Sequence, residues 1–115
     1  MAKNDYFVIM YRILAYLYAC MKQGEKPDMS TVSFEALGIP ESYYNYVMIN
    51  MIEKQYIKGA APFKVLGGIE QVKFIDPHIT QEGVEFLTEN SKMKKTGEFL
   101  KSILEFVPGL SELIP

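Results

Sequence analysis

The chain has 115 residues, 49% of them hydrophobic and 13% aromatic, which suits one domain with a substantial core and is too apolar for a wholly disordered chain. The formal net charge is −2 and no third of the chain is rich in basic residues, so the chain as a whole does not attract nucleic acid or anionic lipid. One cysteine and one histidine exclude an intramolecular disulfide and a zinc site of four Cys and His ligands. We expect a single domain over residues 1–115, in the reducing cytoplasm.

The first predicted helix covers residues 5–22 and ends at Gly24, a typical C-terminal cap residue. Its apolar run is too short for a membrane span and contains Arg12, so we expect no membrane insertion. The helix is apolar on nearly every side, which is typical of an element that is buried all round or faces a partner. We therefore expect part of this surface, with Tyr11 and Tyr18, to lie under the C-terminal segment or in a homodimer interface.

Two further helices are predicted before the first strand. A short second helix, capped by Ser30 or Thr31, ends at Gly38, and a third begins at Pro40 and runs to about Lys54. The turn between them matches the corner of a helix-turn-helix, where glycine can adopt the left-handed conformation. The helical period places on the core-facing arc of the third helix Tyr44, Val47, Met48, Met51 and Ile52. The opposite arc holds Ser42, Tyr43, Tyr46, Asn50, Glu53 and Lys54.

A β-hairpin follows the third helix. Residues 56–65 alternate in character, residues 69–75 form a second extended run, and the glycines in 66–68 are typical of the turn between them. Pro62 cannot donate to a ladder and is expected at an edge, and 76–77, Asp-Pro, is expected to end the second strand.

The C-terminal part is predicted to be helical. Thr80 caps a helix over 81–90, in which Gly83 permits close packing. A last helix is expected at about 92–107, followed by an apolar tail at 108–115. The whole order predicts an α+β fold of the winged helix-turn-helix type, with three N-terminal helices, a β-hairpin wing and two C-terminal helices.

Motifs for catalysis or cofactor binding are absent from the sequence. It has no phosphate-binding loop, no nucleophile elbow and no His-Glu-x-x-His. Cys20 lies among apolar residues, which favours a buried inert thiol, and His78 in Asp-Pro-His is typical of a surface turn. We therefore predict no catalytic, cofactor-binding or metal-binding residues and a protein that is not an enzyme.

Several segments resemble the YjcQ-like family of small bacterial and prophage proteins. They are DYFVIMYRILAYLY at 5–18, LGIPESYYNY at 37–46, QYIKG at 55–59 and the stretch from Ile79 to Met93, and the similarity covers roughly residues 4–105. The resemblance implies a winged-helix-like fold and a phage-linked setting, and it implies no catalytic residues. Gln55 departs from the pattern, because winged helices commonly place glycine between the third helix and the strand.

Two functions are weighed from these residues. A DNA-binding regulator would place in the major groove Ser42, Tyr43, Tyr46 and Asn50, and would set Lys58 and Lys64 on phosphates. The outer face of the third helix offers one lysine beside one glutamate, which gives almost no counterion release. The sequence therefore favours a non-enzymatic winged-helix module that acts through protein contacts, as a homodimer through the first and last helices.

Overall fold

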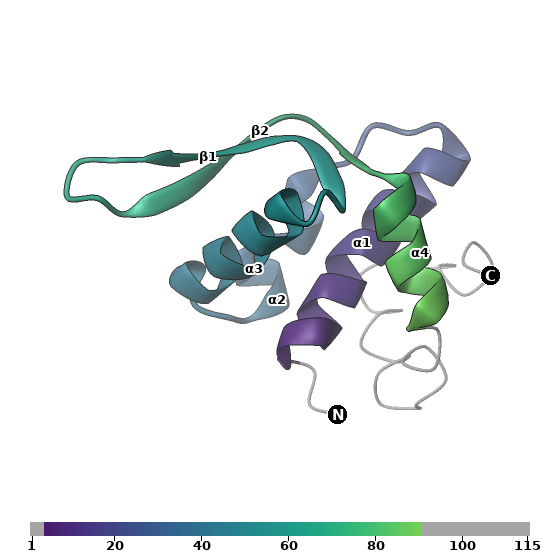
Figure 1. Ribbon diagram of the computed structural model, residues 1–115, viewed down its shortest axis with the longest axis horizontal. Helices are drawn as coiled ribbons and strands as arrows, with labels where there is room; N and C mark the ends of the chain where they lie inside the picture. Colours follow the sequence, from purple (N-terminus) through teal and green to yellow (C-terminus); the bar gives the residue numbers. More distant parts are fainter. Residues whose placement is uncertain (1–3, 91–115) are drawn as a thin grey trace.

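The computed structural model describes residues 4–90, a mixed α+β arrangement of four α-helices, one 3-10 turn and a two-stranded antiparallel hairpin (Figure 1). The elements are α1 (Tyr6–Gln23), η1 (Met29–Val32), α2 (Phe34–Leu37), α3 (Glu41–Glu53), β1 (Ile57–Lys64), β2 (Glu70–Ile79) and α4 (Gln81–Glu89). The predicted last helix at 92–107 and the tail at 108–115 lie outside the described residues.

Helix α1 is the centre of the fold. It lies between α3 and α4 and also contacts β2 and η1 (Figure 1). Almost every side chain from Val8 to Cys20 is buried, including Tyr11 and Arg12. The helix is buried nearly all round within the described residues, because it contacts α3, α4, β2 and η1. The expected cover by the C-terminal segment or by a second copy stays a prediction.

The second helical segment is broken into two pieces. Asp28 caps the 3-10 turn through a bond from the Ser30 N–H at 3.0 Å, and Ser33 caps α2 through a bond from the Ala36 N–H at 3.2 Å. The predicted cap at Ser30 or Thr31 is therefore wrong, since the extended backbone of Ser33 starts a new turn. Gly38 follows α2 with φ 71°, which is the left-handed conformation predicted for this glycine.

Helix α3 packs most of its predicted face into the core: Tyr44, Val47, Met48 and Met51 are buried. Ile52 is half-buried rather than buried, and the buried flank of the helix includes Asn45 instead. Two residues beyond the end of α3, Gln55 is left-handed with φ 63°, and the Tyr56 N–H bonds back to the Met51 carbonyl at 2.9 Å. Gln55 therefore occupies a position that favours glycine.

The hairpin has the predicted strands, but β2 runs to Ile79 and does not end at residues 76–77. The register shifts between Lys58 and Ala60, where the chain bulges. Gly59 has φ 78°, and a Cβ on it would lie 1.8 Å from the backbone oxygen of Asp76. The two strands cross closely at this bulge, and Pro77 lies in β2 at a position where the ladder needs no N–H donor. The strand can therefore continue through the proline.

Thr80 joins the end of α3 to the start of α4. Its hydroxyl accepts the Gly83 N–H at 3.1 Å and donates to the Gln55 carbonyl, and its own N–H donates to the Tyr56 carbonyl at 3.0 Å. A Cβ on Gly83 would lie 2.6 Å from the Tyr56 carbonyl oxygen, which confirms that this glycine permits close packing. The capping residue thus also fixes where α4 lies.

Candidate functional site

An open groove runs along the outer side of α3 and meets the start of β2. Its volume is about 460 Å3. It is lined by Ser42, Asn45, Tyr46, Ile49, Asn50, Glu53, Gly68, Ile69 and Glu70. One wall is therefore the predicted reading face of α3, and the other is the outer end of the hairpin.

Two hydrogen bonds hold the walls of the groove. The buried side-chain amide of Asn45 donates to the backbone oxygen of Glu70 at 3.2 Å, which ties α3 to the first residue of β2. The side-chain amide of Asn50 donates to the Tyr6 hydroxyl at 2.9 Å, and the Tyr6 ring lies edge-on to Tyr46. The groove is therefore preformed by contacts between α1, α3 and β2.

Asn45 lines the groove but is not among the residues predicted for the outer face of α3. It lies next to Tyr44 on α3 and is 8% exposed. A polar residue beside the core-facing arc was the available signal, because a buried amide needs a partner for its hydrogen bonds. The sequence could not reveal that this partner is a backbone oxygen 25 residues away.

The structure brings together three of the four predicted DNA-contacting residues of α3. Ser42, Tyr46 and Asn50 line the groove. Tyr43 does not, because its ring is half-buried and its hydroxyl donates to the Asn4 backbone oxygen at 2.8 Å. Burial raises the pKa of the Tyr43 hydroxyl.

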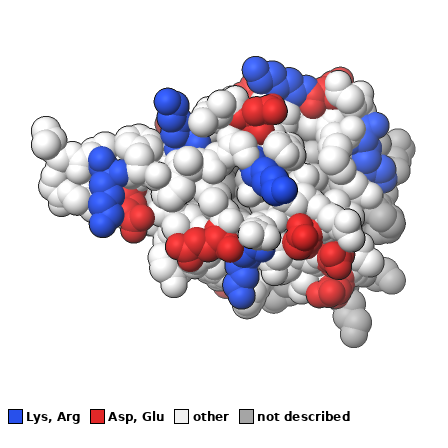
Figure 2. Space-filling view, turned by 45° about the horizontal axis from the view of Figure 1, so that its top comes forward, with Lys and Arg blue, Asp and Glu red and all other residues white. Residues whose placement is uncertain are grey.

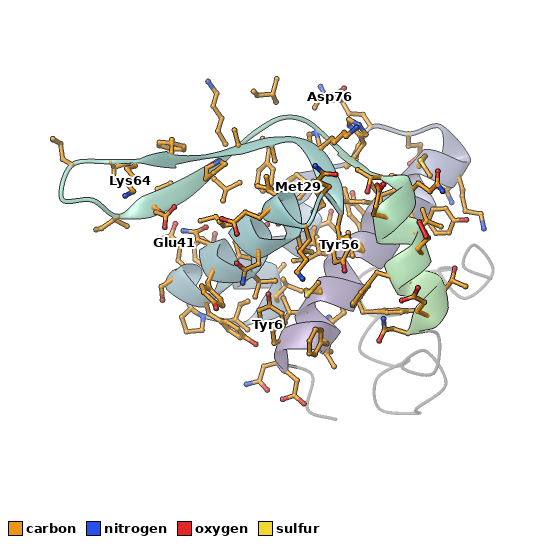
Figure 3. The ribbon with its side chains drawn as sticks, in the orientation of Figure 1. Tyr6, Met29, Glu41, Tyr56, Lys64 and Asp76 are labelled. Carbon is orange, nitrogen blue, oxygen red and sulfur yellow. The ribbon has the colours of Figure 1, made fainter. Side chains whose placement is uncertain are left out.

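The two predicted phosphate-contacting lysines lie on the hairpin, and neither lines the groove, although Lys64 is opposite the lining residue Glu70. Lys58 is opposite His78 near the base of the hairpin, and Lys64 is opposite Glu70 near its outer end (Figure 3). Residues directly opposite each other in an antiparallel pair are side-chain neighbours. Lys64 is therefore placed beside a carboxylate.

The charge of the groove is negative. Among its lining residues, all in the described part of the chain, Glu53 and Glu70 are charged and none is Lys or Arg. On the face drawn in Figure 2, basic side chains stand apart from one another with acidic ones beside them. This face has no continuous positive surface of the kind that phosphate binding requires.

The hairpin extends past the helices (Figure 1), and it carries exposed apolar side chains. They are Phe63, Val65, Leu66, Ile69 and Ile75, of which Leu66 is 99% exposed. Exposed apolar side chains gathered on one element mark a surface that contacts protein or membrane more often than bare solvent.

The remaining reactive side chains are not gathered into a site. Cys20 is buried, and burial raises the pKa of its thiol, so the thiol is protonated and unreactive. His78 is exposed, with Nδ1 2.8 Å from the Asp76 carbonyl oxygen. Within residues 4–90, no group of three or more His, Cys, Asp and Glu side chains could hold a metal ion. In the same range, no helix has the length and apolarity to cross a membrane.

The fold and groove define a small α+β protein with a preformed acidic surface cleft. A family model described as YjcQ protein matches residues 11–106, and the chain belongs to this family. The match includes α3, the hairpin and every residue of the groove. No curated protein and no solved structure matches the chain.

Proposed function

We propose that the protein is a winged-helix module that acts through protein contacts and not through catalysis. The order of elements supports this: α2, the turn at Gly38 and α3 follow one another as in a helix-turn-helix, and the hairpin takes the place of the wing. In this proposal η1 and α2 together stand for the second helix. A phage-linked setting and a cytoplasmic location, which the family resemblance and the composition suggest, belong to the same proposal.

The observation that carries the proposal is the charge of the groove. In a DNA-reading winged helix, the exposed face of α3 enters the major groove and brings cations to phosphates. Here Glu53 and Glu70 lie along that face, and the lining residues include no cation. DNA bound there would lose counterion release and would bring its phosphates near carboxylates.

The hairpin supports the protein-contact function independently. A two-stranded hairpin is marginally stable alone, and exposed apolar side chains such as Leu66 gain stability when another protein covers them. A homodimer through the first and last helices is a separate proposal. On α1, the large apolar side chains that are exposed, and so available to such a homodimer, are Phe7 and Met21.

A titration with random-sequence duplex DNA at about 50 mM and about 200 mM salt tests the proposal, with fluorescence anisotropy as the measurement. We expect no sub-micromolar binding at either salt concentration. Sub-micromolar binding that weakens steeply at higher salt would refute the proposal in favour of a DNA-binding regulator. The double variant Lys58→Ala, Lys64→Ala would then show whether the hairpin lysines contact the phosphates.

A further inference from the structure

The strand register shows which side of the hairpin faces the helices. Ala60, Val72 and Phe74 pack against the core, and Ala60 is directly opposite Phe74. These side chains therefore form the inner face of the hairpin. Because side chains alternate along a strand, the residues between them point away from the helices. This outer face consists of Ala61, Phe63, Val65, Ile69, Gln71, Lys73 and Ile75.

The outer face of the hairpin is largely apolar and open to solvent. Apart from Gln71 and Lys73, all of its side chains are apolar. Its large apolar side chains are between 41% exposed, at Val65, and 68% exposed, at Ile75. Leu66 continues the apolar surface at the tip, where it is almost fully exposed. In Figure 2, which brings the top of Figure 1 forward, much of the surface of the projecting hairpin is uncharged.

The two edges of the hairpin are poorly suited to a further strand. The Val65 N–H donates to the Ile69 carbonyl at 3.0 Å, and bonded pairs alternate with unbonded ones along an antiparallel ladder. Pro62 therefore lies where its backbone points to the free edge of β1, and it has no N–H to offer there. At the edge of β2, the Glu70 carbonyl already accepts the Asn45 amide at 3.2 Å. We therefore expect a partner on the outer face.

The exposed apolar area of the hairpin matches what one copy contributes to a homodimer. At about 150–200 Å2 for a whole large apolar side chain, the exposed parts of the outer face and of Leu66 amount to roughly 500–600 Å2. A stable interface buries about 800 Å2 per partner, and about 65% of that area is apolar in homodimers. The apolar share of such an interface is therefore about 520 Å2 per partner.

The chemistry of the outer face also favours a second copy. A lipid surface is held by apolar side chains together with several cations, whereas this face has Lys73 alone and the hairpin also carries Glu70 and Asp76. An apolar face is complementary to an identical face, and a two-fold axis lets both copies use it. The long side chain of Lys73 can keep its amine in solvent at the rim. Helix α4 leads away from the hairpin, so the chain beyond Asn90 starts at the distant end of α4 (Figure 1).

We propose that the protein forms a homodimer through the outer faces of two hairpins, an inference that rests on the proposed protein-contact function and names its partner. The two hairpins pack face to face, and each covers Phe63 and Ile75 of the other. The groove lies beside the edge of β2, and most of its lining residues belong to α3, so it stays accessible in this dimer. This interface is distinct from a homodimer through the first and last helices.

Sedimentation velocity of the full chain from about 2 to about 200 μM tests the inference. We expect the wild type to form a dimer, and the double variant Phe63→Ser, Ile75→Ser to weaken dimer formation by about 100-fold or more. The matched control is Phe7→Ser, Met21→Ser, which removes two exposed apolar side chains from α1 and should leave the dimer unchanged. Far-UV circular dichroism checks that both double variants are folded.

Two-dimensional NMR of the 15N-labelled wild type gives a second measurement that needs no variant. The amides of Phe63, Gln71 and Lys73 should shift with protein concentration, because they lie on the outer face. The amide of Asn50, in the groove, should not shift.

Three results would overturn the inference. The first is a wild type that stays monomeric at about 200 μM, and its co-sedimentation with anionic lipid vesicles would then assign the hairpin to a membrane surface. The second is a dimer that survives Phe63→Ser, Ile75→Ser and is lost in Phe7→Ser, Met21→Ser, which would place the interface on α1. The third is a concentration dependence confined to amides outside the hairpin.

Failure of the dimer can be told apart from failure of the proposed function. A monomer that binds no DNA leaves the protein-contact function in place with a different partner. Salt-sensitive DNA binding by a hairpin dimer would overturn the function and leave the dimer standing.

Discussion

Removing the Thr80 hydroxyl should destabilise the fold, because that hydroxyl connects two elements that are distant in sequence. In Thr80→Ala, the Gly83 N–H loses its cap and the Gln55 carbonyl loses its donor. The backbone bond from the Thr80 N–H to the Tyr56 carbonyl is unaffected by the change. The loss of stability in Thr80→Ala therefore measures the contribution of the Thr80 side chain alone.

The magnitude follows from these two bonds. Loss of a helix N-cap costs about 1 kcal/mol. Loss of the second hydrogen bond, which leaves the part-buried Gln55 carbonyl without its donor, adds roughly 1 kcal/mol. We therefore expect Thr80→Ala to lower the free energy of unfolding by about 2 kcal/mol. The urea midpoint should fall by about 1–2 M for a domain of this size.

Urea unfolding followed by far-UV circular dichroism measures this loss, with Thr80→Ser as the matched control. Serine keeps the hydroxyl and removes one methyl group, so it should cost less than about 1 kcal/mol. A loss below about 0.5 kcal/mol in Thr80→Ala would refute the reasoning. An equal loss in both variants would assign the effect to the methyl group and not to the hydrogen bonds.

Three other changes have defined outcomes. Gln55→Gly should raise the unfolding free energy by about 0.5–1 kcal/mol in urea, because glycine adopts the left-handed φ of 63° without strain; a loss would contradict this. Met51→Ala should cost about 2–5 kcal/mol and Ile52→Ala about 1–2 kcal/mol, because Met51 is fully buried and Ile52 half-buried; equal losses would contradict this phase of α3. Burial raises the pKa of Tyr11 to about 12 from 10, so the unfolded chain ionises first and stability falls between pH 10 and 12 by on the order of 2 kcal/mol. Urea unfolding at pH 9 and pH 11.5 should show a smaller fall in Tyr11→Phe, and an equal fall would contradict the assignment.

Local sequence signals predicted most of the element order. The expected helix at 5–22 is found at Tyr6–Gln23, and the glycine-containing turn at 66–68 joins the two strands as expected. The second strand was predicted to end at residues 76–77, because Asp-Pro usually marks the end of a strand, but β2 continues to Ile79. The bulge opposite Gly59 that lets the strand continue depends on how the two strands cross.

The candidate site could be predicted only in part. The helical period identified Ser42, Tyr46 and Asn50 as one outward face, and the structure places all three in the groove. It did not predict that Tyr43, on the same arc, bonds to Asn4 near the start of α1. The helical period describes one helix alone, so it cannot show which outward positions another segment covers.

The sequence alone determined most of the described elements of this protein, because helical and strand periods, caps and turns depend on neighbouring residues. It also determined the near-neutral charge of the outer face of α3. Only the tertiary structure decided that this face becomes one wall of an acidic groove. That outcome depends on the bond between Asn45 and Glu70, which joins residues 25 positions apart and brings a second carboxylate to α3. Such a contact leaves no periodic signal in the chain, because its geometry is set by the packing of the hairpin against the helices.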